Sequence, residues 1–253
     1  MINTSVLLVD ISNTRTKFRL SHNGVICDEQ RVLPTCQIAT ASVNACVSGW
    51  SFSSALVSSV VPQAAETLRL AFSHLPVRFV SMSDTLPVNF SGYSGKDTLG
   101  ADRICNVLGV VVKGYYPAVA IDMGTAVTFD VVDKKGNVPP VFLGGIISPG
   151  VALFRDYLSR RTAQLPLVDT PAEIAPEALA QHTIGAIQSG LYYGVRGMVK
   201  GILDSISSTL SCKPYVIITG GDAEWIAGQM PEIHEVDPLL TFRGMNLLLE
   251  FES

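Results

Sequence analysis

Two short segments of the sequence carry an acid, small residues and a hydroxyl residue directly after an apolar run. The first is Asp10-Ile11-Ser12-Asn13-Thr14 and the second is Asp122-Met123-Gly124-Thr125-Ala126. A strand that ends in a tight turn directs successive backbone N–H groups toward its open end, and such a concavity binds anions. The carboxylate repels phosphate but can hold a cation that binds it. One such segment alone is most simply an ordinary hairpin turn, because Asp, Gly, Asn and Thr are common turn residues.

The segments that must position these turns repeat along the chain. In each half an apolar run leads into the aspartate, and a second run that can return as its hairpin partner follows the turn. We expect strands at residues 5–9 and 17–20 in one half and at 118–121 and 127–132 in the other. Such a repeat implies two similar lobes with a cleft between them. Because the turn occurs twice, and Thr219-Gly220-Gly221 follows a late strand, phosphate binding is favoured over the ordinary hairpin.

The rest of the chain also alternates between strand and helix patterns. Residues 55–61, 77–80 and 215–218 are short apolar runs that are typical of buried strands. Residues 101–113 have the apolar spacing of an amphipathic helix, and residues 183–206 indicate a longer one. The longer helix contains small residues that permit the close approach of a second helix, namely Gly185, Ser189, Gly190, Gly194 and Gly197.

The composition restricts the class of protein. The net charge is −4 and no Lys/Arg cluster occurs, which disfavours sequence-independent nucleic-acid binding. No apolar run reaches the roughly 18–20 residues that a membrane helix needs. Hydrophobic residues nevertheless make up 47% of the chain, and surplus apolar surface without a membrane span favours a homo-oligomer.

The N-terminus and the cysteines indicate a cytoplasmic protein. Residues 1–5 lack the basic region and the small-residue cleavage site of a signal peptide. The 5 cysteines are widely spread and form no CxxC or Cys/His cluster, so a structural zinc site is not expected. We expect reduced, mostly buried thiols.

The paired turns and the late glycine pair resemble those of the superfamily that contains sugar kinases, acetate kinase, actin and Hsp70-type ATPases. In that superfamily, paired Asp-x-Gly turns face each other across the nucleotide phosphates, and a late glycine pair contacts the adenosine. The resemblance implies an α/β fold of two ribonuclease H-like (actin-like ATPase) lobes with a central cleft. We expect an N-terminal lobe at residues 1–115 and a C-terminal lobe at residues 116–253.

Within this superfamily the chain resembles the type III pantothenate kinases over nearly its full length. The distinctive Gly-x-Asp-Arg motif of that family is matched by Gly100-Ala101-Asp102-Arg103, with Asn106 after it. Each match is modest evidence, but together and in sequence order they are highly specific. The other matches are Asp10 to Thr14 with Lys17, residues 58–62, 122–128 and 144–150, Thr183 with Ser189 and Gly190, residues 219–221, and Asp237-Pro238.

The resemblance implies ATP-dependent phosphorylation of pantothenate to 4′-phosphopantothenate, the first step of coenzyme A biosynthesis. It implies that Asp102 is the general base, that Arg103 clasps the substrate carboxylate, and that Tyr93, with Gly100 and Ala101, contacts pantothenate. It also implies a homodimer with the substrate site at the interface, where Thr183 comes from the neighbouring subunit. The simpler interpretations are a helix-terminal acid for Asp102 and a helix N-cap for Thr183.

The cofactors implied by the resemblance are ATP, Mg²⁺ and a monovalent cation. Asp10 is expected to hold hydrated Mg²⁺, Thr125 to bind ATP, and Asp122 to bind K⁺ or NH₄⁺. The backbone amides of the first turn and its return strand are expected to surround phosphate oxygens. These residues are Ile11, Ser12, Asn13, Thr14, Arg15, Thr16 and Lys17.

The pattern departs from the family at Ser12, which stands where the family has Gly. If φ is positive there, Ser carries a strain of about 1 kcal/mol and its Cβ crowds the phosphate. Alternatively, the backbone is ordinary and the hydroxyl donates to a phosphate oxygen. Ser12 is also the one feature that favours a catalytically weak, regulatory relative over an active kinase. A kinase for another small hydroxylated substrate is a third hypothesis, against which the matches at Tyr93 and the Gly-x-Asp-Arg motif argue.

Overall fold

The computed structural model describes residues 5–82, 85–168 and 174–250, and the chain divides into two compact units. The first unit contains the chain up to Tyr115, together with Val132–Leu143 and the C-terminal segment from Leu239. The second unit contains Tyr116–Val131 and Gly144–Pro238. Two segments that were expected in the C-terminal lobe, at residues 132–143 and from residue 239, belong to the first unit.

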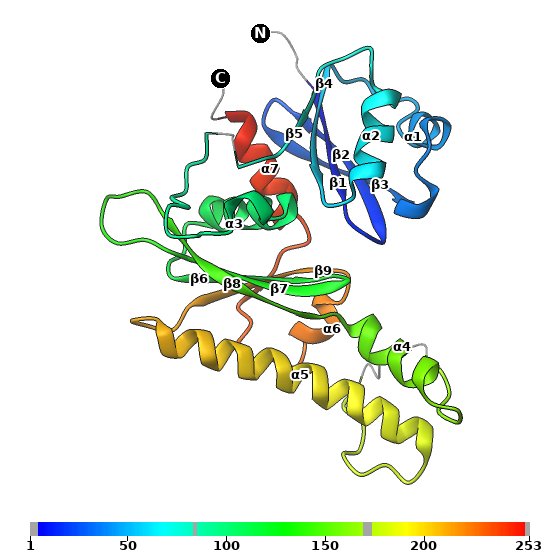
Figure 1. Cartoon of the computed structure of the whole chain (residues 1–253). Coiled ribbons are helices and arrows are strands. Elements are labelled where there is room, and N and C mark those ends of the chain that lie inside the picture. The colour runs from blue at the N-terminus through cyan, green and yellow to red at the C-terminus, as the bar shows by residue number, and fades with distance from the viewer. Residues whose placement is uncertain (1–4, 83–84, 169–173, 251–253) are drawn as a thin grey trace. The chain divides into compact units, whose positions relative to one another are not determined.

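The first unit is built on a five-stranded sheet (Figure 1). Its strands lie in the order β3 (Val25–Pro34), β2 (Arg15–His22), β1 (Ser5–Ile11), β4 (Ser54–Ser59) and β5 (Val77–Phe79). β1 pairs antiparallel with β2 and parallel with β4. Because side chains alternate along a strand, Leu7, Val9 and Ile11 enter one apolar core, and Asp10 points to the opposite face.

Helices cover the first sheet. α1 (Thr40–Cys46) and α2 (Pro62–Ala71) share the apolar core with Leu7, Val9 and Ile11. α3 (Ala101–Lys113) packs on α7 (Leu240–Glu250), and these two helices also contact β4 and β1. A buried hydrogen bond from Thr241 Oγ1 to Asn106 Oδ1, 2.8 Å long, links α7 to α3. α3 has the bounds that its apolar spacing predicts. Two short 3₁₀ helices span Thr35–Gln37 and Lys96–Thr98.

The second sheet repeats the strand order of the first. It runs β8 (Val141–Pro149), β7 (Ala126–Asp133), β6 (Ala118–Met123), β9 (Tyr215–Gly220) and β10 (Glu235–Val236). β6 pairs parallel with β9, as β1 does with β4. The two sheets therefore confirm the α/β class and the repeat that the two turns indicate.

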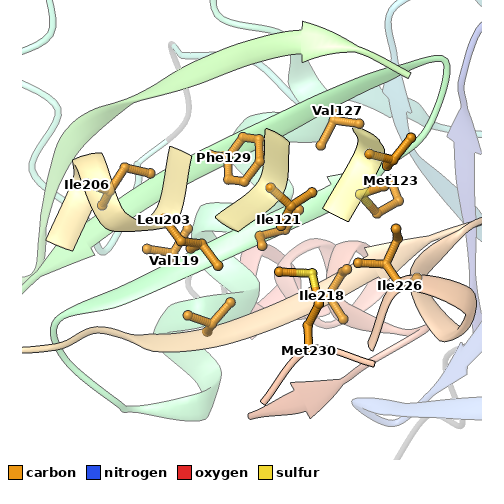
Figure 2. Packing of buried hydrophobic residues seen from close by; sticks show 14 of the residues in the cluster. Val119, Ile121, Met123, Val127, Phe129, Leu203, Ile206, Ile218, Ile226 and Met230 are labelled. Atoms are coloured by element: carbon orange, nitrogen blue, oxygen red, sulfur yellow. The ribbon is translucent and has the colours of Figure 1, made fainter. Parts of the chain in front are cut away.

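One long helix, α5 (Thr183–Thr209), covers the core of the second unit (Figure 2). Its residues Leu203 and Ile206 lie over Val119, Ile121 and Phe129 of the sheet. α6 (Ala223–Ala227) contributes Ala223 and Ile226 to this core. α4 (Val151–Arg161) follows β8 directly. The strands expected from residues 118, 127 and 215 are confirmed as β6, β7 and β9. The Asp122 turn joins β6 to β7, and both strands are anchored in this core.

Candidate functional site

The Asp10 turn connects β1 to β2 in the first unit. Ser12 N donates to Arg15 O at 3.1 Å, which closes the turn. The carboxylate of Asp10 is buried, and Lys17 Nζ, on the strand position paired with Asp10, lies 3.8 Å from its Oδ2. Asn13, Thr14 and Arg15 are exposed at the tip. The turn thus presents polar backbone beside a buried carboxylate that a cation already approaches.

Ser12 is accommodated without backbone strain. Among the described residues other than glycine, only Asn23 has a positive φ, so Ser12 lies outside the left-handed region. Its hydroxyl is 3.5 Å from Asp10 Oδ2, at the limit of hydrogen bonding, and its carbonyl accepts from Thr35 Oγ1 at 2.7 Å. Of the two alternatives for Ser12, the strained conformation is therefore wrong.

A buried hydroxyl lies beside Asp10 on the neighbouring strand. Ser58 of β4 is in register with Asp10, so both side chains emerge on the same face of the sheet. Ser58 is fully buried, and its Oγ has no hydrogen-bond partner in the described protein. An unsatisfied hydroxyl next to a carboxylate suits a hydrated cation, whose waters need acceptors and donors. The residues at this turn therefore fit hydrated Mg²⁺.

Asp102 lies in the first turn of α3, and its carboxylate folds back over Gly100. Asp102 Oδ1 accepts a hydrogen bond from Arg103 N at 2.7 Å. A Cβ on Gly100 would lie 2.5 Å from that oxygen, so a side chain there would displace the carboxylate from this position. The same Cβ position is 3.4 Å from Val60, whose N–H donates to Ile11 O at 3.1 Å. Val60 thus links the start of α3 to the residue after Asp10. The bond to Arg103 N is also the contact that a helix-terminal acid would make.

The other two substrate contacts expected in this unit, Tyr93 and Arg103, lie against one aromatic ring. The Tyr93 ring is 5.2 Å from the ring of Phe142, and Arg103 Cζ is 5.9 Å from the same ring centroid. Arg103 is only 7% exposed, which excludes a solvated surface arginine. Sequence reasoning missed Phe142, because an aromatic residue at the start of a strand carries no local signal of this contact.

The Asp122 turn connects β6 to β7 in the second unit and is closed by Gly124 N donating to Ala126 O at 3.1 Å. Gly220, with φ of +99°, lies against it so closely that a Cβ would be 2.6 Å from Met123 N and 2.7 Å from Asp122 Oδ1. From another segment, Gly150 N donates to Thr125 O at 3.1 Å. The Asp122 carboxylate therefore lies in a backbone-lined cradle that a side chain at Gly220 would fill. Carboxylate and carbonyl oxygens are the donors that hard cations prefer, so the cradle fits K⁺.

A buried arginine holds α6, the helix that follows Gly220 and Gly221. Arg196 of α5 lies close to two rings, 3.8 Å from the Tyr192 centroid and 4.5 Å from the Trp225 centroid. Its Nη2 donates to Trp225 O at 2.5 Å. Burial lowers the pKa of Arg196 from its ordinary value, and the ring faces offset part of the desolvation. The glycine pair is thus followed by a helix that is fixed to α5.

Thr183 is exposed at the first residue of α5, but it does not cap the helix. Gly185 N donates to His182 Nδ1 at 3.1 Å, so His182 is the N-cap and the simpler interpretation of Thr183 is wrong. Thr183 lies on the rim of an apolar groove of about 590 Å³ between α4 and α5. The groove is lined chiefly by Leu153, Phe154, Tyr157, Leu158, Ile187 and Leu191.

The described part of the chain also bears on metal clusters, membrane helices and the burial of the cysteines. It contains no group of three or more His, Cys, Asp or Glu side chains that could hold a metal ion. Within the same ranges, no helix is both long and apolar enough to cross a membrane. All 5 cysteines are free, but Cys36 and Cys212 are exposed and only Cys105 is buried, so the expectation of mostly buried thiols was wrong.

Comparison with known proteins identifies the family. The family model described as type III pantothenate kinase matches residues 6–205. The chain belongs to the type III pantothenate kinase family. It is 39% identical over 241 residues to the type III pantothenate kinase of Akkermansia muciniphila, covering 95% of this chain and 96% of the relative. It is 34% identical over 252 residues to that of Methylacidiphilum infernorum, covering 97% and 88%. As a member of this family it is an ATP-dependent kinase.

Solved structures that are similar to this kinase show the fold alone. A protein from Campylobacter jejuni that is described as a Baf family transcriptional activator has a TM-score of 0.65 at 22% identity, covering 97% of this chain and 98% of that one. The ethanolamine utilization protein EutJ from Carboxydothermus hydrogenoformans has a TM-score of 0.59 at 13% identity, covering 98% and 91%. These neighbours confirm the actin-like ATPase fold.

Proposed function

We propose that this chain transfers the γ-phosphoryl group of ATP to the primary hydroxyl of pantothenate. The product is 4′-phosphopantothenate, which makes this the first step of coenzyme A biosynthesis. The observation that carries the proposal is the start of α3, where Asp102 and the buried Arg103 stand next to each other in a chain of this family. One residue is a proton acceptor and the other is a fixed cation that suits a carboxylate.

In this mechanism Asp102 is the general base. The pantothenate hydroxyl oxygen forms the new bond to the γ-phosphorus, the bond to the bridging oxygen breaks, and ADP leaves. The hydroxyl proton passes to the Asp102 carboxylate. Phosphoryl transfer depends mainly on positioning and charge neutralisation, so a carboxylate held at a fixed helix start suits the task. The hydrogen bond from Arg103 N holds that carboxylate, and the lack of a side chain at Gly100 leaves space for it.

The two turns hold different cations. Asp10, with Ser58 beside it, would hold hydrated Mg²⁺, which would supply positive charge beside the ATP phosphates. Asp122 would hold K⁺ or NH₄⁺ in the cradle beside Gly220, and Thr125, exposed at the turn, would contact ATP. The turn from Ile11 to Lys17, which is exposed at its tip from Asn13 to Arg15, would bind phosphate oxygens.

The kinase functions as a homodimer whose substrate site includes Thr183 of the second copy. Apolar side chains that a monomer would leave in water surround Thr183: Leu153, Tyr157 and Ile184 are each at least half exposed. Gly190 and Gly194 of α5 have nothing within 4 Å of an added Cβ, so a second helix can approach there. Mixing Asp102→Asn with Thr183→Arg, each inactive alone, should restore activity through mixed dimers. Failure to restore it with exchanging dimers would refute the shared site.

The regulatory alternative has lost its support, because Ser12 has an ordinary backbone conformation. The remaining alternatives are separated by a coupled ATPase assay with and without pantothenate, on the wild type and on Asp102→Asn. We expect turnover that requires pantothenate and that falls at least ~100-fold in Asp102→Asn, the low end for loss of a general base.

Asp102→Asn keeps the size of the side chain and an oxygen that can accept from Arg103 N, so its stability should match that of the wild type. Turnover that does not depend on pantothenate would indicate another substrate. An unaffected Asp102→Asn variant would rule out Asp102 as the base.

A further inference from the structure

The ring on which Tyr93 and Arg103 converge belongs to a distant segment, the hairpin of β7 and β8. Phe142 lies at the start of β8 and is 1% exposed. Its ring is 5.2 Å from the Tyr93 ring at an interplanar angle of 61°, and 5.3 Å from the ring of Phe90. Rings packed edge to face at this distance attract each other and have a preferred orientation. The contact with Phe142 therefore constrains the position of the Tyr93 ring.

The hairpin also fixes the backbone of the loop that carries Tyr93. Asn89 N donates to Pro140 O at 2.7 Å, and Phe142 N donates to Asn89 O at 3.0 Å. These bonds form a parallel bridge between Asn89 and Val141. Beyond the bridge, Tyr93 N donates to Phe90 O at 3.0 Å. The loop therefore has little freedom to move Tyr93 unless the start of β8 moves with it.

The contact with Arg103 is of a kind that leaves its hydrogen-bonding edge to other groups. The guanidinium carbon lies 5.9 Å from the Phe142 centroid, within the range of a cation–π interaction. Such an interaction depends on the charge of the guanidinium and requires no hydrogen bond from its five N–H donors. Those donors have the geometry for paired bonds with a carboxylate. The ring can thus orient the guanidinium without competing with an anionic substrate.

We infer that Phe142 is a positioning residue that sets Tyr93 and Arg103 for the acid substrate. This inference rests on the proposed roles of Tyr93 and Arg103. It assigns to the β7–β8 hairpin a part in substrate affinity, although no residue of that hairpin needs to touch the substrate. The grouping of residues 132–143 with the first unit agrees with this role, because Tyr93 and Arg103 belong to the same unit.

The test compares two Phe→Leu substitutions in the first unit. Phe72 is the matched control, because it is 2% exposed and its ring makes one edge-to-face contact, 5.6 Å from Phe52. Phe142→Leu should raise the KM for pantothenate about tenfold, because small displacements of positioning groups have large effects on substrate alignment. It should leave the KM for ATP within about twofold of the wild type. Phe72→Leu should lower stability but leave both KM values nearly unchanged.

If Phe142→Leu does not fold, Phe142→Met, which fills similar space without an aromatic ring, takes its place. A double-mutant cycle then shows whether Phe142 acts through Tyr93. In a Tyr93→Leu background the substitution at Phe142 should raise the KM for pantothenate much less than it does in the wild type.

Equal rises in both KM values, the same effect from Phe72→Leu, or full additivity with Tyr93→Leu would overturn the inference and leave the proposed function intact. If Tyr93→Leu and Arg103→Met themselves left the KM for pantothenate unchanged, the proposed substrate contacts and this inference would both fall.

Discussion

The two turns have the same place in two sheets of the same strand order, but different parts of the protein hold them. At the Asp10 turn the neighbours include side chains, namely the ammonium of Lys17 and the hydroxyls of Ser12 and Thr35, beside backbone bonds from Thr35 N to Thr14 O and from Val60 N to Ile11 O. At the Asp122 turn the neighbours are backbone, because Gly220 and Gly150 press against residues 122–125. A Cβ at Gly124, the position that corresponds to Ser12, would make only ordinary contacts, 3.5 Å from Ala126 O. The Cβ that the Asp122 turn does not accept is one on Gly220 or Gly150, which would collide with the backbone of the turn.

The two units also differ in the chemistry that they carry. The first unit contains Asp10 and all the substrate contacts expected of one chain, which are Tyr93 and the Gly100 to Arg103 motif. The second unit contains Asp122, Thr125 and the glycine pair, and it also contains Thr183. In the proposed function, proton transfer and the substrate contacts made within one chain fall to the first unit. The second unit would hold the monovalent cation, contact the adenosine and provide Thr183 to its dimer partner.

Among substitutions that distinguish the two turns, the largest loss of stability is expected at Gly220, which packs against the Asp122 turn. In Gly220→Ala the new Cβ would meet Met123 and Asp122 in a left-handed conformation, so we expect a loss of about 3 kcal/mol in the free energy of unfolding. Gly221→Ala is the matched control, since nothing lies within 4 Å of its Cβ, and its stability should change by less than about 0.5 kcal/mol.

Urea unfolding measures both changes. Gly221→Ala should still raise the KM for ATP if the Gly220-Gly221 pair contacts the adenosine. Equal stability of the two variants would contradict the backbone packing of the Asp122 turn.

The smallest effect is expected at Ser12. Because Ser12 is unstrained and its contact with Asp10 is long, Ser12→Gly should change the KM for ATP by less than about threefold, with any change toward a higher KM. Steady-state kinetics at saturating pantothenate checks this. A clear fall in the KM for ATP would show that the side chain of Ser12 crowds the phosphate. The Asp10 turn would then not accept a serine freely.

Much of the fold could be predicted from the sequence, because local pattern determines it. The periodic apolar positions of residues 101–113 predict α3 with its observed bounds, and the two strand–turn–strand patterns predict the paired sheets. The association of residues 132–143 and α7 with the first unit could not be predicted, since it depends on contacts between segments far apart in sequence.

The site shows the same limit. Recognisable motifs contain Asp102, Arg103 and Asp122. The contacts of Phe142 with Tyr93 and Arg103 are tertiary, and the residues beside Phe142 in the sequence do not indicate them. His182 is an intermediate case. It precedes a long helix, where a cap is needed, but a threonine hydroxyl is the more familiar cap, so the simpler interpretation named Thr183 instead of His182.

The division of work between the turns is tested most directly by titrating Mg²⁺ and K⁺ against turnover of Asp10→Asn and Asp122→Asn. Each change removes one charge and keeps the size of the side chain. We predict that Asp10→Asn needs more Mg²⁺ for half-maximal activity and keeps its stimulation by K⁺. Asp122→Asn should lose most of the stimulation by K⁺ and keep the Mg²⁺ requirement of the wild type. Parallel shifts in both cation requirements in both variants would contradict the assignment of one cation to each turn.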